Sequence, residues 1–180
     1  MKYILFPLSN PGKKYENTRH NAGKIVLGFL KKDKSFLNIL ESENIDIFIG
    51  EDFYMNESGK GIRSYIKNKN FQKENLIVMY DDKDLPIGEV RLSINKNDGG
   101  HNGLKNIIET LNTKEFYRLR IGIAPKGTGE NGVIPPHGEA VQRYVLSNFR
   151  EEEIEILKSE KVLERIKIYL EEIIKNKRLQ

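Results

Sequence analysis

The 180-residue sequence contains no cysteine, which excludes a disulfide scaffold, thiolate ligands for a metal and a cysteine nucleophile. It has no apolar run of about 18 residues, so we expect no membrane-spanning segment. The strand-like opening, MKYILFPL, is not followed by the small-residue cleavage site of a signal peptide, so we expect a cytoplasmic protein. The G-x-S-x-G motif of serine hydrolases and the G-x-G-x-x-G motif of dinucleotide-binding proteins are also missing, which argues against both classes.

Charged residues make up 31% of the chain and hydrophobic residues 38%. The apolar residues fall in periodic clusters that can form a core, and the length is typical of one domain, here residues 1–180. Thirty lysines and arginines stand against 26 aspartates and glutamates, which leaves a net charge of +4. This surplus permits a polyanionic partner without proving one.

The hydrophobic pattern predicts both strands and helices. Short runs of branched and aromatic residues predict strands at residues 3–8, 45–49, 76–80, 90–94 and 117–123. Apolar residues at helical spacing predict helices over 19–31, 58–66 and 103–111, and one long helix from Glu151 onward. Residues 127–138, rich in glycine and proline, are expected to form a mobile surface loop, and residues 139–146 are ambiguous. Alternating strands and helices predict an α/β fold with a twisted mixed, largely parallel sheet flanked by helices.

Polar residues follow the two most strongly predicted strands. Asn10 comes after the first strand, and Asp81 comes directly after residues 76–80, LIVMY. In parallel sheets, functional sites collect beyond the carboxyl ends of the strands, so both residues are candidates for one site. His20 lies at a predicted helix start, where the helix dipole disfavours an imidazolium and a nearby carboxylate favours it. These opposing effects suit a general base with a pKa near neutrality, and Asp81 is the carboxylate best placed to orient it.

The acidic group Asp81, Asp82 and Asp84 leaves a magnesium site open as an alternative, because hard cations prefer oxygen ligands. No second acidic cluster follows another strand, so we expect neither a metal nor a cofactor. The other two histidines, His101 and His137, are interpreted as ordinary polar residues. The glycine pair before His101 indicates backbone held close to a ligand at a helix start.

Five sequence blocks resemble those of bacterial peptidyl-tRNA hydrolases. They are NPGKKYENTRHNAG at 10–23, YMNESG at 54–59, DDKDLPIG at 81–88, GGHNGL at 99–104 and YRLRIGI at 117–123. Five blocks in the family's order are too many to agree by chance. The resemblance implies an enzyme that cleaves the ester between a peptide and the terminal ribose of tRNA, which recycles tRNA from prematurely released translation products.

The resemblance also implies roles for the candidate catalytic residues. His20 is the general base that activates water, and Asp81 stabilises and orients it. Asn10, Asn56 and Asn102 hold the peptide main chain and the attacked carbonyl. Neutral amides suit a peptide of arbitrary sequence, because they bind main-chain groups without reading side chains.

The tRNA end of the substrate is expected to contact a second set of residues. Tyr15 and Tyr54 occupy the family's positions near the terminal adenosine and the peptide. Arg91, Lys105 and Arg120 are the candidates for phosphate contacts, which position tRNA without reading its sequence. The partner is therefore expected to be the acceptor end of peptidyl-tRNA, bound by a monomer.

The chain departs from the family pattern at three places. Pro7 lies in the first strand, where its missing N–H is expected to make the sheet locally irregular. Tyr54 adds a hydroxyl to the usual phenylalanine. Ser93 and the segment NKND at 95–98 replace an often basic position and a glycine-rich stretch, both on the tRNA side. A non-catalytic RNA-binding protein of the same fold is the alternative, and the retained site residues favour the enzyme.

Overall fold

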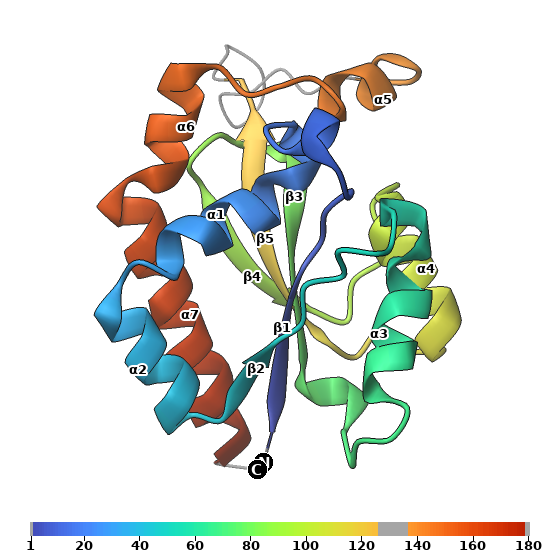
Figure 1. Cartoon of the computed structure of the whole chain (residues 1–180), viewed down its shortest axis with the longest axis vertical. Coiled ribbons are helices and arrows are strands. Elements are labelled where there is room, and N and C mark those ends of the chain that lie inside the picture. The colour runs from blue at the N-terminus through green and yellow to red at the C-terminus, as the bar shows by residue number, and fades with distance from the viewer. Residues whose placement is uncertain (1, 126–136, 179–180) are drawn as a thin grey trace.

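The structure, a computed structural model, describes residues 2–125 and 137–178. Its centre is a five-stranded sheet in the order β2-β1-β3-β5-β4 (Figure 1). β1 (Tyr3–Pro7) is parallel to β2 (Ile45–Ile47) and to β3 (Leu76–Pro86), and β3 is parallel to β5 (Tyr117–Ala124). β4 (Val90–Ile94) runs antiparallel to β5 at one edge. The prediction of a mixed, largely parallel sheet is confirmed.

Helices cover both faces of this sheet (Figure 1). One face carries α1 (Ala22–Leu30), α2 (Lys34–Ser42), α6 (Glu151–Lys158) and α7 (Glu160–Arg178). The other face carries α3 (Ser58–Ile66) and α4 (Asn102–Leu111), and the short α5 (Ala140–Val145) lies near the carboxyl ends of the parallel strands. The 3₁₀ turns in the described residues are η1 (Lys13–Tyr15), η2 (Arg19–Asn21), η3 (Met55–Glu57) and η4 (Lys73–Asn75).

β3 is the central strand because it is buried on both faces. Ile77 and Met79 belong to the core cluster under α1, α6 and α7, and Leu76 and Val78 belong to the cluster under α3 and α4. Successive side chains of a strand point to opposite faces, so an unbroken apolar run fits between two helix layers. β3 is longer than predicted and continues to Pro86, so Asp81 lies within the strand.

The long helix predicted from Glu151 onward is wrong, because the structure has two helices that meet at Ser159. Ser159 has an extended backbone, with φ −60° and ψ 148°, and its hydroxyl donates to the carbonyl of Ile156. A serine side chain competes with the helical backbone through such local bonds. The helix predicted over 19–31 begins as the 3₁₀ turn η2 and ends at Leu30. Of the loop predicted over 127–138, all but the last two residues lie outside the described residues.

Pro7 does not disturb the sheet, so the expected irregularity is wrong. The register between β1 and β3 is continuous up to the pairing of Pro7 with Met79, and the N–H of Leu8 then donates to the Met79 carbonyl at 2.9 Å. On the other side, β2 pairs with β1 only as far as Leu5. The missing N–H of Pro7 therefore lies beyond the end of β2, where no ladder bond needs it.

Candidate active site

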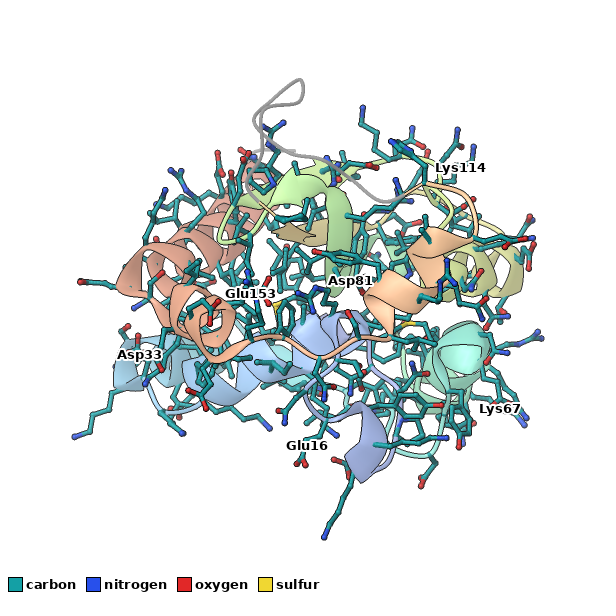
Figure 2. All side chains as sticks on the ribbon, turned by 90° about the horizontal axis from the view of Figure 1, so that it is seen from above. Glu16, Asp33, Lys67, Asp81, Lys114 and Glu153 are labelled. Carbon is teal, nitrogen blue, oxygen red and sulfur yellow. The ribbon has the colours of Figure 1, made fainter. Side chains whose placement is uncertain are left out.

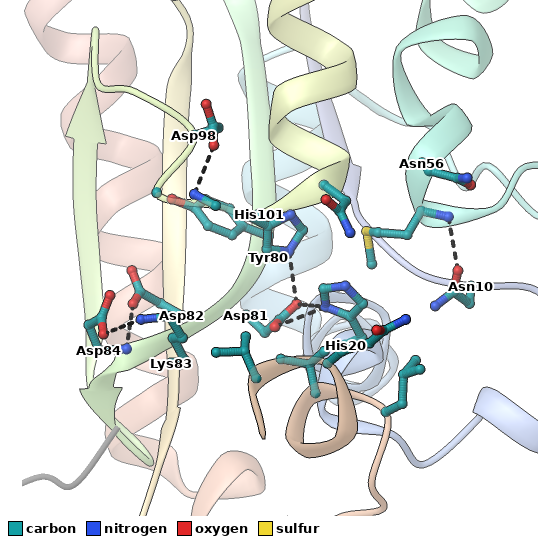
Figure 3. Close-up of a pocket in the computed structure, with 18 of the residues that line it drawn as sticks. Asn10, His20, Asn56, Tyr80, Asp81, Asp82, Lys83, Asp84, Asp98 and His101 are labelled. Carbon is teal, nitrogen blue, oxygen red and sulfur yellow. Dashed lines mark hydrogen bonds and ion pairs between the residues drawn. The ribbon is translucent and has the colours of Figure 1, made fainter. Parts of the chain in front are cut away.

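A large pocket lies at the carboxyl ends of β1 and β3 (Figure 3). Its volume is about 930 Å³, and its walls come from β3, the loop after β1, η3, the connection between β4 and α4, and α5. The pocket brings together every residue that the sequence analysis assigns to catalysis or peptide binding: Asn10, Tyr15, His20, Tyr54, Asn56, Asp81 and Asn102.

His20 and Asp81 are in direct contact (Figure 3). Nδ1 of His20, on η2, lies 2.9 Å from Oδ1 and 3.0 Å from Oδ2 of Asp81 on β3. The expected proximity of these two side chains is confirmed. His101 joins them, because its Nε2 lies 3.0 Å from Asp81 Oδ1. His101, to which the sequence analysis assigns no role, thus contacts the same carboxylate as His20. It belongs to the buried cluster.

Hydrogen-bond partners determine which ring nitrogens carry protons. His101 caps α4, and its Nδ1 accepts the N–H of Leu104 at 3.4 Å, so its own proton lies on Nε2 and is donated to Asp81. An ionised carboxylate only accepts hydrogen bonds, so Nδ1 of His20 also donates to Asp81. Nε2 of neutral His20 is left with a lone pair and, within the described residues, has no hydrogen-bond partner.

Burial and charge act in opposite directions on this cluster. Burial alone would lower the pKa of His20, but charge attraction to Asp81 and their hydrogen bond outweigh it, so this pKa lies above its ordinary value of 6.5. Burial alone would raise the pKa of Asp81, but both imidazoles hold it well below its usual range. Asp81 therefore stays ionised, and the raised pKa of His20 means that its imidazole keeps a proton to higher pH than an ordinary histidine does. Burial, reinforced by Asp82, raises the pKa of Tyr80 to about 12, so this neighbour stays neutral.

Two glycines allow the elements that carry the imidazoles to approach the sheet. A β-carbon on Gly23, at the start of α1, would lie 2.4 Å from the carbonyl oxygen of Met79 on β3. One on Gly103, in the first turn of α4, would lie 2.7 Å from the sulfur of Met55 and 2.8 Å from Cδ1 of Leu8. The contact at Gly23 is with the backbone of β3, so this position needs glycine for close approach, whereas at Gly103 a β-carbon would displace the side chains of Met55 and Leu8.

Asn10 is held so that one end of its amide is free. Its Oδ1 accepts the backbone N–H of Met55 at 2.9 Å (Figure 3). Its backbone N–H donates to Oδ1 of Asn21 at 2.8 Å, and Nδ2 of Asn21 donates back to the Asn10 carbonyl at 3.0 Å. Because Oδ1 is engaged, Nδ2 is the group that Asn10 can offer to a ligand. Asn21, which the sequence analysis does not single out, positions this donor.

The remaining candidate side chains lie around the mouth of the pocket. Asn56 on η3 and Asn102 at the start of α4 are exposed and line it. Tyr15 and Tyr54 meet edge to face, with ring centroids 6.3 Å apart and planes at 88°. Tyr54 is 47% exposed, so its ring can stack with or contact a planar group of a ligand.

The two further aspartates have partners of their own. Asp82 accepts from Nε of Arg120 at 2.7 Å and from the backbone N–H of Asp84 at 2.9 Å, and Asp84 pairs with Lys83 at 2.6 Å. Asp81 instead faces the imidazoles (Figure 3). The three aspartates considered for a magnesium site thus each have a different partner, and their carboxylates do not converge on one point.

The described residues contain one set of converging ligand atoms, from His20, Asp81 and His101, within 4.8 Å of one another. A metal ligand must offer a free lone pair. The two nitrogens that face Asp81 carry protons in the hydrogen-bonded arrangement above, so they are placed as donors to the carboxylate and do not fit a bound cation.

The basic side chains differ in their relation to the pocket. Arg120 lines it while paired with Asp82. Arg91, on the edge strand β4, pairs with Glu89, and Lys105 is exposed on α4. Neither of these two described basic residues is in the pocket lining. Of the three candidate phosphate contacts, Arg120 is the one that lines the same pocket as the His20–Asp81 pair.

Comparisons with known proteins show the family of this chain. The sequence model of the peptidyl-tRNA hydrolase family matches residues 4–180. The chain belongs to that family. A peptidyl-tRNA hydrolase of Azobacteroides pseudotrichonymphae is 43% identical over 178 residues, which is 93% of this chain and 90% of the relative. The enzyme of a Sulfurihydrogenibium species is 41% identical over 156 residues, covering 81% and 78%.

Solved structures of peptidyl-tRNA hydrolases share the fold. A single-residue mutant of the Acinetobacter baumannii enzyme superimposes with a TM-score of 0.74 at 25% identity, over 97% of this chain and 91% of that one. The peptidyl-tRNA hydrolase family comprises hydrolases that act on peptidyl-tRNA, so the resemblance found in the five sequence blocks is confirmed. None of the helices in the described residues has the length and apolar character required to cross a bilayer.

Proposed function

We propose that this chain hydrolyses the ester between peptide and tRNA in peptidyl-tRNA, with water activated by His20 and with Asp81 in support. The observation that carries the proposal is the contact between an ionised carboxylate and Nδ1 of His20, which leaves Nε2 free in the pocket. Family membership supports the substrate and the reaction. We also propose that the protein acts as a monomer in the cytoplasm, without metal or cofactor.

The proposed reaction needs a single activated water. Water bound at Nε2 of His20 gives a proton to that nitrogen while its oxygen attacks the acyl carbon. Asp81 stabilises the imidazolium and stays ionised, because His101 donates a second N–H to it. The acyl C–O bond then breaks, and the ribose oxygen takes up the proton held on Nε2 of His20 and leaves as a hydroxyl, which returns the imidazole to its neutral form. A positioned general base contributes about 10²–10⁴-fold, and an ester has a good enough leaving group to need no covalent intermediate.

Asn10 is the proposed donor to the carbonyl oxygen as negative charge develops on it. Its Nδ2 is free to donate because Met55 holds the other end of the amide. Such a donor is worth about 10²–10³-fold when it is fixed before the reaction begins. Asn56 and Asn102 are the proposed contacts for the peptide main chain.

Binding of the tRNA end is proposed to use rings and cations around the pocket. The Tyr15–Tyr54 pair offers aromatic edges and faces to the terminal adenosine. Arg120, with Arg91 and Lys105 farther out, is proposed to contact phosphates. If Z phosphates of a double-stranded stem are neutralised, the logarithm of the affinity falls against the logarithm of salt with a slope of about −0.9Z.

Replacing Asp81 with asparagine is expected to lower kcat less than loss of His20 does, and to move the acid limb of the kcat/KM profile to lower pH. Asp81 is what raises the pKa of His20 against burial, so removing its charge lets that pKa fall. Profiles of kcat/KM against pH for both proteins measure the shift. A midpoint that stays where it is in the wild type would contradict the assigned pairing.

The direct test of the proposed function is hydrolysis of N-acetyl-aminoacyl-tRNA by the purified protein in the presence of EDTA. We expect turnover at the same rate with and without the chelator, because the nitrogens around Asp81 are donors and not metal ligands. Loss of activity in EDTA, restored by magnesium, would favour the aspartate-based metal site. Tight tRNA binding without any turnover would favour the RNA-binding alternative.

A further inference from the structure

Arg19, beside His20 on η2, has no part in the chemistry described above, yet the residue is only 6% exposed. Its Nη2 donates to both carboxylate oxygens of Glu153, at 2.8 and 2.7 Å, and Glu153 is 3% exposed. Nη2 thus contacts both oxygens of one carboxylate, and a hydrogen bond between two ionised groups is stronger than one between neutral groups. The turn that carries His20 is therefore anchored to α6.

The rest of the guanidinium holds the segment 144–149. Nη1 of Arg19 donates to the carbonyl of Asn148 and, at 3.2 Å, to the hydroxyl of Ser147. The guanidinium carbon lies 4.7 Å from the ring centre of Tyr144 and 5.1 Å from that of Phe149. The backbone N–H of Arg19 also donates to the Ser147 carbonyl at 3.0 Å. η2 and this segment are thus joined through one residue.

The segment 144–149 begins in α5, which forms a wall of the pocket. Val141, Gln142, Val145 and Leu146 line the same pocket as His20. At the other end of the network, Glu153 lies in the first turn of α6, and Figure 2 shows it between that helix and the centre of the molecule, where Asp81 lies. Arg19 therefore connects the base on one wall of the pocket to α5 on another.

We propose that Arg19 is a positioning residue for the hydrolysis: together with Glu153, it sets the placement of His20 relative to the α5 wall. This inference rests on the proposed function, because it concerns the alignment of water and ester in that pocket. A buried ion pair that serves stability alone can be replaced without effect on chemistry in the folded protein. Here the shape of the guanidinium matters, since it contacts both walls at once.

The test is Arg19→Lys, which keeps the charge and replaces the planar fork with a point charge. In protein shown to be folded by circular dichroism, we expect kcat for N-acetyl-aminoacyl-tRNA to fall by about 10- to 100-fold, because a small misplacement of a catalytic group has effects of that size. KM is expected to change by a smaller factor. Glu153→Gln keeps the side-chain shape and removes the charge, and kcat is expected to fall in the same direction. If Arg19→Lys does not fold, the kcat of Glu153→Gln tests the proposal in its place.

The control is Lys167→Met, which removes a partly buried ion pair elsewhere in the molecule. Nζ of Lys167, on α7, lies 2.6 Å from Oδ2 of Asp33, which Figure 2 places at the margin of the molecule, away from Asp81. We expect a lower Tm with kcat within about twofold of the wild type, because distant sites act independently.

The proposal is overturned if Arg19→Lys and Glu153→Gln lower Tm as the control does but keep wild-type kcat, because Arg19 would then serve stability alone. The experiment distinguishes failure of the proposed function from failure of the role of Arg19. Wild-type protein that does not cleave the ester would contradict the proposed function, whereas active wild type with unaffected variants contradicts only the role of Arg19.

Discussion

Replacing His20 with alanine is expected to lower kcat for N-acetyl-aminoacyl-tRNA hydrolysis by about 10²–10⁴-fold, the usual contribution of a positioned general base. The neutral imidazole has its proton on Nδ1, donated to Asp81, so Nε2 is the acceptor that the variant lacks. KM is expected to change little, because the ring acts on the attacking water. Single-turnover rates at saturating enzyme separate the chemical step from binding.

His137→Ala is the matched control, because this described histidine is exposed and is absent from the pocket lining. Its kcat is expected to equal that of the wild type. Retention of most of the rate by His20→Ala would reject His20 as the base, whatever the control shows.

Replacing Asn10 with aspartate is expected to lower kcat by about 10²–10³-fold, the usual effect of losing one donor to an oxyanion. The substitution is nearly isosteric, and the retained Oδ1 still accepts the N–H of Met55, so the loop keeps its main anchor. The donor Nδ2 becomes a carboxylate oxygen, which repels the charge that develops on the attacked carbonyl.

Asn38→Asp on α2 controls for the added charge, because Asn38 is exposed and lies outside the large pocket. This control is expected to keep the wild-type kcat. If Asn10→Asp leaves kcat unchanged and raises KM, Asn10 contributes to binding of the ground state and does not stabilise the oxyanion.

The sequence predicts the contact of His20 with Asp81 because two local patterns lead to one place. The LIVMY run, short and rich in branched residues, predicts a buried strand, and Asp81 follows it in the sequence. The helix start at His20 and the glycine three residues later bring that turn against the same strand, where the Gly23 position lies beside Met79. Local pattern and sheet topology therefore suffice for this pair.

The rest of the site depends on partners that no local pattern connects. His101 donates to Asp81 from Nε2 because its Nδ1 accepts a backbone N–H of α4. Both contacts depend on the orientation of the ring, which the sequence does not specify. Arg19 meets Glu153 across 134 positions of sequence. Arg120, a proposed phosphate contact, is also paired with Asp82 in the structure, a partner that the sequence pattern does not indicate. Such pairings follow from tertiary packing, which residue type and spacing leave open.

The central claim is that His20, oriented by Asp81, is the general base. The most direct test is nitrogen NMR of the ¹⁵N-labelled protein across the pH range. The His20 signals are assigned by their absence in His20→Ala. We predict that the neutral ring carries its proton on Nδ1, with a midpoint above 6.5 that coincides with the acid limb of kcat/KM. A neutral ring protonated on Nε2, or a midpoint that differs from the kinetic one, would contradict the assignment.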